Sequence, residues 1–401
     1  MVLSGLERAM SRPHLETLAL HGGVFRADPA TLAVTPPVYQ TTSYQFRDTD
    51  HATRLFALKE VGYTYTRTIN PTREFLERRV SAVEGAKAAL AVATGAAALL
   101  NAVLTLAGRG DSVVVSRDLG TGPHACLPGT LERFGLHVRW ADPSDPASFA
   151  RLSDASTRAW VAESLSLPRL ELFPVRAVAA QAEGIPVIID NTFLPLTVRP
   201  GDDGAAVVVY SAAEVLSGSD TTAGGLLLDT GALAWEARPE RVPALNTPDP
   251  SYHGAVWTDV VRPWQASPYT ARARGNPLRD LGAAISPLAA FQLLQGVETL
   301  PLRVPAQAAT AAYLAEALEG HPALTGVRRT PGALVGLDFA TKTQAQAFLA
   351  ALTLIQARPT LGGARSAACL FALPAPRVVV LVGLEHADDV AGDLLQALKT
   401  V

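Results

Sequence analysis

Residues 207–225 read Val-Val-Val-Tyr-Ser-Ala-Ala-Glu-Val-Leu-Ser-Gly-Ser-Asp-Thr-Thr-Ala-Gly-Gly, a β-branched run that breaks at Ser211 and passes into a glycine-rich turn. Upstream, residues 185–193 read Ile-Pro-Val-Ile-Ile-Asp-Asn-Thr-Phe, and this apolar run ends at Asp190. A buried strand that ends in a polar residue delivers that residue to the edge of an α/β sheet. The two stretches therefore predict buried strands that carry Ser211 and Asp190 to a sheet edge.

The chain around these stretches alternates apolar strands with helical segments. Such alternation predicts an α/β fold whose mostly parallel sheet has helices on both faces. The expected strands are residues 90–93, 112–115, 137–141, 160–163 and 186–190. The expected helices are residues 96–107, 128–134 and 175–183, and one capped by Thr72 with Leu76, Val80 and Val83 on one face.

The composition shifts to Pro, Trp, Arg and polar residues between about 240 and 280. The sequence therefore predicts an N-terminal arm over residues 1–60, a large α/β domain over 61–250, and a smaller α+β domain over 251–401. The expected elements of the last part are helices 286–299, 306–318 and 388–398 and strands 333–339 and 378–382.

Composition excludes several functional classes. Of 401 residues, 48% are apolar and 18% charged, which indicates a globular protein with a large core. The net charge of −3 gives no electrostatic basis for binding nucleic acid or an anionic membrane. Cys126 and Cys369 form no CxxC motif, so we expect no metal site and no disulfide framework, as in a cytoplasmic protein. Residues 1–12 do not read as a signal peptide, and the uncharged run over residues 88–108 reads as strand, turn and helix rather than a membrane span.

The chain contains only four lysines among its 34 basic residues. Arginine stays protonated and cannot act as an amine nucleophile, so any imine chemistry must use one of these four side chains. They are Lys59, Lys87, Lys342 and Lys399.

Two short motifs could bind a phosphate group. Gly95 and Ala96 follow an expected strand and begin an expected helix, where backbone N–H groups and the positive helix end point at one spot. Tyr65 and Arg67 offer a phenol and a guanidinium that can both bind phosphate oxygens. Each motif alone is equally typical of an ordinary turn or a solvated charge.

Several further motifs occur in one collinear order along nearly the whole chain. They are Tyr39-Gln40-Thr41-Thr42-Ser43, Tyr65-x-Arg67-x-x-Asn70-Pro71-Thr72, Glu84-Gly85, Asp190-Asn191-Thr192-Phe193, Thr221-Thr222-x-Gly224-Gly225, Pro250-Ser251-Tyr252-His253-Gly254, Leu278-Arg279-Asp280-Leu281-Gly282-Ala283 and Val382-Gly383-Leu384-Glu385-His386. This set resembles the pyridoxal-phosphate enzymes of Cys/Met metabolism, and in particular their O-acetylhomoserine sulfhydrylase (aminocarboxypropyltransferase) branch.

The resemblance implies a fold-type-I pyridoxal-phosphate-dependent transferase fold and roles for six residues. Asp190 would be the partner of the cofactor's pyridinium nitrogen, although it also reads as a strand-end carboxylate bonded to local backbone. Ser211 and the amides of Gly95 and Ala96 would hold the phosphate. Tyr65 and Arg67 would reach into a neighbouring subunit's site, which implies a homodimer or homotetramer.

Four positions depart from the family's pattern. Glu214 stands where the family has the lysine that forms the Schiff base, and a carboxylate cannot condense with an aldehyde. Ala213 replaces a threonine of the phosphate cup, and Gly120 falls where the family has a tyrosine stacked on the ring. Val379 aligns with the arginine that binds the substrate carboxylate, and Arg365 or Arg377 is a candidate replacement.

Three hypotheses follow. In the first, the chain has lost aldimine chemistry and is a pseudoenzyme that assembles with, or regulates, an active paralogue in a hetero-oligomer; pyridoxal phosphate would then not be covalently attached. In the second, it is an active transferase or lyase that forms C–S bonds on O-acetylhomoserine in transsulfuration. In the third, it binds an anionic metabolite without chemistry.

Overall fold

The computed structural model describes residues 13–23, 27–371 and 375–401. The expectation that residues 1–12 form no signal peptide lies outside this part of the chain. Within it, no helix is long and apolar enough to cross a membrane, and the run over residues 88–108 forms a strand, a turn and a helix.

The core of the large domain is a seven-stranded sheet in the order β1-β7-β6-β5-β4-β2-β3. Strand β7 pairs antiparallel with both of its neighbours and the other pairs are parallel, so the predicted mostly parallel sheet is confirmed. The strands are β1 (Ala88–Val92), β2 (Ser112–Ser116), β3 (His137–Ala141), β4 (Thr157–Glu163), β5 (Val187–Asp190), β6 (Val207–Ser211) and β7 (Gly225–Asp229).

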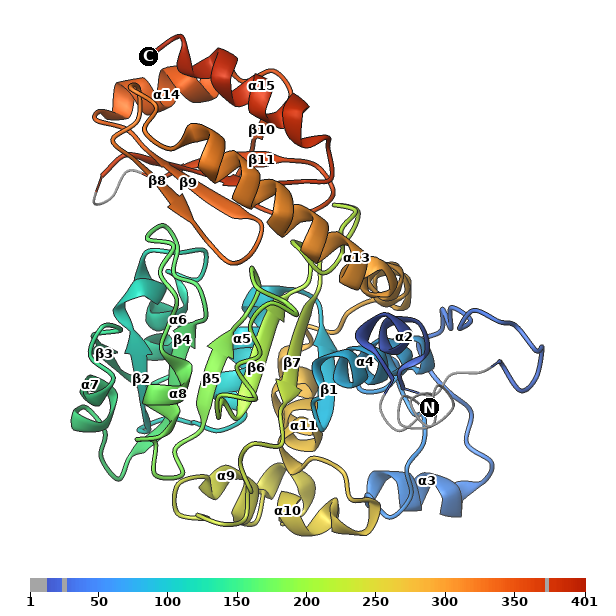
Figure 1. Ribbon diagram of the computed structural model, residues 1–401. Helices are drawn as coiled ribbons and strands as arrows, with labels where there is room; N and C mark the ends of the chain where they lie inside the picture. The colour runs from blue at the N-terminus through green and yellow to red at the C-terminus, as the bar shows by residue number, and fades with distance from the viewer. Residues whose placement is uncertain (1–12, 24–26, 372–374) are drawn as a thin grey trace, which may run out of the picture.

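Helices cover both faces of this sheet (Figure 1). Helix α4 begins at Pro71 behind an Asn70 cap, and its apolar face, with Leu76 and Val80, is buried. The helices before residue 282 are α2 (Leu15–His21), α3 (Thr49–Phe56), α4 (Pro71–Glu84), α5 (Gly95–Leu104), η1 (Arg117–Gly120), α6 (Leu127–Arg133), α7 (Ala147–Arg151), α8 (Val175–Ala179), α9 (Pro243–Asn246), η2 (Pro250–Tyr252), α10 (Trp257–Val260), η3 (Arg262–Trp264), α11 (Pro268–Ala273), η4 (Arg274–Leu278) and α12 (Arg279–Leu281).

The N-terminal arm is more regular than expected, because it contains α2 and α3. The buried guanidinium of Arg79 donates hydrogen bonds to the carbonyls of Ala19 and Gly22, which fixes α2 against α4. The predicted boundary at residue 250 falls inside a segment that packs on the large sheet, since Leu245 and Trp257 are buried in the same hydrophobic cluster as strand β1.

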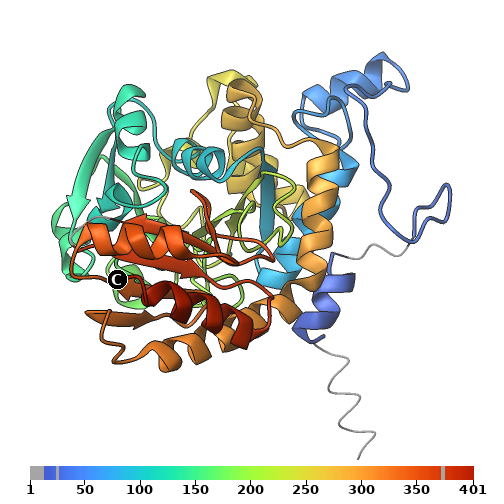
Figure 2. The ribbon, with the colours of Figure 1, turned by 90° about the horizontal axis from the view of Figure 1, so that it is seen from above.

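The smaller domain has a five-stranded sheet in the order β10-β11-β12-β9-β8 and lies over the carboxyl edge of the large sheet (Figures 1 and 2). One helix, α13 (Pro287–Leu318), joins the two domains. The remaining elements of the smaller domain are β8 (Gly326–Arg329), β9 (Leu334–Asp338), α14 (Lys342–Ala351), β10 (Gln356–Ala357), β11 (Ala367–Phe371), β12 (Arg377–Leu381) and α15 (Ala387–Leu398).

The expectation of two helices, 286–299 and 306–318, is wrong, because α13 continues through Pro301 and Pro305. Each internal proline costs a helix about 3 kcal/mol. Buried apolar residues on both sides of the prolines, such as Leu293 and Leu314, bind the helix to both domains and offset that cost.

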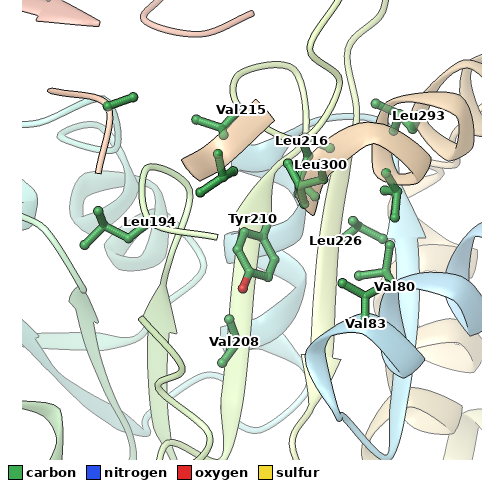
Figure 3. Close-up of a cluster of buried hydrophobic side chains, with 14 of the residues drawn as sticks. Val80, Val83, Leu194, Val208, Tyr210, Val215, Leu216, Leu226, Leu293 and Leu300 are labelled. Atoms are coloured by element: carbon green, nitrogen blue, oxygen red, sulfur yellow. The ribbon is translucent and has the colours of Figure 1, made fainter. Parts of the chain in front are cut away.

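One hydrophobic cluster runs from the large sheet into this domain boundary (Figure 3). Tyr210 of β6 lies at its centre with Leu226 of β7, Val80 of α4 and Leu300 of α13 around it. Val215, one residue beyond Glu214, is buried in the same cluster. The backbone beside Glu214 is therefore anchored in the core.

Candidate functional site

Three parallel strands deliver polar side chains to one edge of the large sheet. Glu163, Asp190 and Ser211 are the last residues of β4, β5 and β6, respectively. In the strand register Glu163 lies opposite Asp190, so their carboxylates share this edge. The carboxyl edge of a parallel sheet is where α/β proteins bind ligands.

Asp190 is buried and both of its oxygens have a neighbour. Oδ1 accepts a hydrogen bond from the Thr192 amide at 2.9 Å, as expected of a strand-end carboxylate bonded to local backbone. Oδ2 lies 2.9 Å from Nε2 of His124 in an ion pair. Thr192 also accepts the Ser211 amide through Oγ1, which ties the ends of β5 and β6 together.

His124 comes from the loop between η1 and α6, and the sequence analysis did not identify it. Burial alone would lower the pKa of His124, but contact with Asp190 and the charges of Asp190, Glu163 and Glu214 outweigh burial and raise that pKa to about 9. The imidazole is therefore a cation at neutral pH. The available signal was a histidine close after the Leu119–Gly122 stretch.

Glu163 is a buried carboxyl group, and its Oε2 has no hydrogen-bond partner among the described residues. A side chain at Gly122 would press against this carboxyl group, because a Cβ there would lie 3.1 Å from Oε1. Burial, followed by the charge of Asp190, raises the pKa of Glu163 to about 8. Glu163 is therefore mostly neutral at pH 7.

Replacing Glu163 by glutamine is expected to stabilise the protein. The folded-state pKa of Glu163 lies above the value of 4.5 in the unfolded chain, so its favourable contribution is complete below pH 4.5 and is lost as the pH rises through 8. Glutamine resembles the neutral acid at every pH, so the gain is about 3 kcal/mol at pH 7. Urea unfolding from pH 4 to pH 9 measures it.

The control is Glu171→Gln, an exposed carboxylate to amide change in the same part of the fold. The gap between Glu163→Gln and the unsubstituted protein should widen from pH 4.5 to pH 8, whereas Glu171→Gln should show no such widening. A constant gap for Glu163→Gln across this range would contradict an elevated pKa.

Glu214 lies in the turn that follows β6, and its side chain returns to the end of that strand. The Ser211 side chain lies close to the Glu214 carboxyl group, whose Oε2 is buried with no hydrogen-bond partner among the described residues. Burial raises the pKa of Glu214, and the nearby Ser211 side chain opposes that rise. An acid side chain thus occupies the neighbourhood of Ser211.

The predicted phosphate cup is assembled around Ser211. The start of α5 approaches so closely that a Cβ at Gly95 would lie 2.7 Å from Ser211 Oγ, so only glycine fits there. Thr94 caps α5 by accepting the Ala97 amide at 3.1 Å. The amides of Gly95 and Ala96 are in the first turn, where they have no intrahelical acceptor. The structure therefore brings the start of α5 at Gly95 into close contact with Ser211.

The turn that carries Glu214 is fixed from two sides. The buried guanidinium of Arg303, on α13, donates hydrogen bonds to the carbonyls of Val215 and Leu216 at 2.8 and 3.0 Å. From the smaller domain, Gly362 packs directly on the Glu214 backbone and leaves no space for a side chain. Both domains therefore hold Glu214 in place.

Tyr65 and Arg67 are exposed, and the Arg67 guanidinium lies 5.5 Å from the centroid of the Tyr65 ring. They line a groove of about 1040 Å³, whose other walls include Trp257 and Trp264. Asp190 and Ser211 do not line it. One chain therefore does not unite all six predicted residues.

All four lysines are exposed. Lys87 precedes β1, which runs in the same direction as β6, so it lies at the opposite edge from Ser211. Lys59 follows α3 in the arm, while Lys342 and Lys399 belong to the start of α14 and the end of α15.

The candidate arginines of the smaller domain have other contacts. Arg377 forms an ion pair with Asp338 at 2.5 Å and donates to the carbonyl of Pro168. Arg365 is exposed, and Val379 is fully buried in the cluster that joins the domains. The structure places a third guanidinium near Glu214, that of Arg358, which bonds Asp220 at 3.1 Å and the carbonyl of Gly362.

The expectation that Gly120 stands where the family has a ring-stacking tyrosine stays a prediction. A Cβ at this position would lie 3.2 Å from the indole of Trp140 on the edge strand β3. The imidazole of His124 lies at ion-pair distance from Asp190. The aromatic group at this end of the site is therefore a cation.

Comparison with known proteins identifies the lineage of this site. The model of the Cys/Met metabolism PLP-dependent enzyme family matches residues 16–376. The chain belongs to this family. It is 38% identical to O-acetyl-L-homoserine sulfhydrylase of Leptospira meyeri over 96% of the chain and 97% of that protein. It is 35% identical to homocysteine synthase of Schizosaccharomyces pombe over 96% of the chain and 98% of that protein.

The fold-type-I prediction is confirmed by a solved structure. A putative O-acetylhomoserine (thiol)-lyase from Campylobacter jejuni superposes with a TM-score of 0.89 at 31% identity, covering 96% of this chain and 99% of that one. That structure contains N'-pyridoxyl-lysine-5'-monophosphate, a lysine joined to the cofactor. Pyridoxal phosphate is thus the cofactor of this family.

The residues of this chain fit the cofactor only in part. The close approach of Gly95 to Ser211 suits a phosphate. The carboxyl group of Glu214 lies close to Ser211 at the same place, and the imidazole of His124 is paired with Asp190. At the position where the resemblance places the family's lysine, this chain has Glu214, and its four lysines are exposed.

Proposed function

We propose that this chain is an O-acetylhomoserine sulfhydrylase-like family member that has lost aldimine chemistry. The supporting observation is the pair of Ser211 and Glu214: an acid lies at the cup, while the four lysines are exposed elsewhere. A carboxylate neither condenses with an aldehyde nor attracts a phosphate. We infer a cytoplasmic setting from the free thiols of Cys126 and Cys369.

The two other hypotheses receive less support from the site. An active C–S bond-forming transferase on O-acetylhomoserine draws on the activities named for the relatives, but it needs an amine here. A binder of an anionic metabolite would have to place a negative charge beside Asp190 and Glu214, with His124 already paired. Like charges at this edge oppose such a ligand.

The experiment compares this protein with the Leptospira meyeri sulfhydrylase as a positive control. Each is incubated with pyridoxal phosphate and then with O-acetylhomoserine and sulfide. We expect the control to show the absorbance band of a lysine Schiff base and to release homocysteine, and this protein to do neither. Turnover by this protein would overturn the proposal.

We further propose that the chain assembles with an active paralogue and completes the paralogue's phosphate site. Tyr65 and Arg67 are exposed and lie in a groove separate from Asp190, so they are available to a second subunit. Their phenol and guanidinium are suited to phosphate oxygens. The surface that a subunit would donate is thus intact, whereas the accepting cup holds Glu214.

Arg67→Ala is expected to weaken cofactor retention in such a mixed oligomer about tenfold, since a charge-assisted hydrogen bond to phosphate is lost. The measurement is the rate of cofactor release from co-expressed, co-purified oligomers of this chain with the active relative. Arg133→Ala, an exposed arginine on α6, is the matched control. Failure of the two chains to co-purify would sink the assembly proposal.

A further inference from the structure

The carboxylate of Asp190 is already neutralised by a side chain of the same protein. Its Oδ1 accepts the Thr192 amide and its Oδ2 is 2.9 Å from His124 Nε2. Asp190 and His124 are both largely buried, with side-chain exposures of 4% and 11%. The ion pair is thus an internal feature of the site rather than a surface contact.

The chemistry of this pair matches what the family's cofactor would need from Asp190. A protonated pyridine and a protonated imidazole are both flat aromatic cations that present one N–H to a carboxylate. In pyridoxal-phosphate sites an acidic residue commonly partners the pyridine nitrogen. With His124 at ion-pair distance from Oδ2, a pyridine nitrogen cannot take the same position without displacing the imidazole.

The carboxylate of Asp190, at the end of β5, favours retention of the His124 imidazolium. The other acids that act on His124 are Glu163, at the end of β4 and mostly neutral at pH 7, and Glu214, in the turn after β6. Farther out, Asp118 acts on Glu163 and is itself 3.5 Å from the guanidinium of Arg169. The imidazolium is the one positive group that contacts Asp190 among the described residues.

We propose that His124 is the specificity-determining residue of this site: its imidazolium occupies the pyridine position on Asp190 and excludes the cofactor ring. This deepens the proposed loss of aldimine chemistry. At the phosphate end the carboxyl group of Glu214 lies close to Ser211, so side chains of the protein approach both groups that would hold the cofactor. Side chains of the protein itself therefore occupy the place where the cofactor would bind.

The test uses pyridoxamine 5'-phosphate, which carries an amine instead of an aldehyde and so binds without a lysine. All proteins carry Glu214→Gln, which removes the repulsion at the phosphate end. Affinity, read from ligand fluorescence, is compared with and without His124→Ala. We expect His124→Ala to tighten binding at least tenfold, and the gain to disappear when Asp190→Asn is added.

His137→Ala, which removes an exposed imidazole at the start of β3, is the control and should leave affinity unchanged. Equal affinities with and without His124→Ala, or no binding in either protein, would overturn the inference. A gain that survives Asp190→Asn would also overturn it, because the effect would then not pass through the ion pair.

A second measurement uses the unsubstituted protein, so it does not depend on whether a variant folds. NMR titration of the His124 imidazole in the unsubstituted protein should give a pKa well above 6.5, and a value near 6.5 would show that no ion pair forms. Neither readout depends on lysine chemistry. A cofactor adduct on a native lysine would therefore refute the proposed function separately from these results.

Discussion

The double variant Glu214→Lys, His124→Ala is expected to form a covalent pyridoxal-phosphate adduct at residue 214. Lysine at 214 supplies an amine beside Ser211, and removal of the imidazole frees Asp190. The turn around residue 214 is held by Arg303 and Gly362, so the new amine should stay at the cup. Borohydride reduction and peptide mass spectrometry locate the adduct.

The single variant Glu214→Lys should form the pyridoxal-phosphate adduct less completely, because the His124 imidazole is still paired with Asp190. Glu236→Lys in the His124→Ala background makes the same charge change at an exposed position and should carry no adduct. If the double variant is folded and residue 214 remains unmodified, position 214 is not the equivalent of the family's lysine.

Arg303→Met is expected to destabilise the protein by about 3 kcal/mol, because three buried backbone carbonyls lose charged donors and only part of the cost is offset by removing a buried charge. The carbonyls belong to Val215, Leu216 and Gly296. Burial lowers the pKa of Arg303 to about 10, which reflects the cost of keeping this cation inside.

Urea unfolding measures the free-energy loss, and hydrogen exchange at the amides of Val215 and Leu216 reports on the turn itself. Both amides should exchange faster in Arg303→Met. Arg133→Met, at an exposed position, should change neither quantity. Unchanged exchange at the turn would mean that Arg303 does not hold it.

The sequence predicted the sheet because its strands are continuous apolar runs that end in polar residues, as at Asp190 and Ser211. The family resemblance also implied that Gly95 and Ser211 belong to one site, and the structure places them in close contact. The break expected at Pro301 failed because packing against two domains outweighs the local cost of proline. The local cost of proline in a helix is overridden where extensive tertiary burial stabilises that helix.

His124 and Glu163 could not be predicted for a different reason. A lone histidine in a loop carries no periodic signal, and its pairing with Asp190 depends on where the loop after η1 folds back. Glu163 ends a strand that was predicted, but its proximity to Asp190 follows from the β4–β5 register, which the sequence does not specify. Side-chain contacts that form only through tertiary packing could not be predicted from the sequence.

Borohydride reduction of the unsubstituted protein after incubation with pyridoxal phosphate, followed by peptide mass spectrometry, tests the central claim most directly. The Leptospira meyeri sulfhydrylase serves as the reaction control. We expect no stoichiometric pyridoxyl adduct at Lys59, Lys87, Lys342 or Lys399. A stoichiometric adduct at any one of them, together with homocysteine formation, would contradict the account and show a working enzyme of the family.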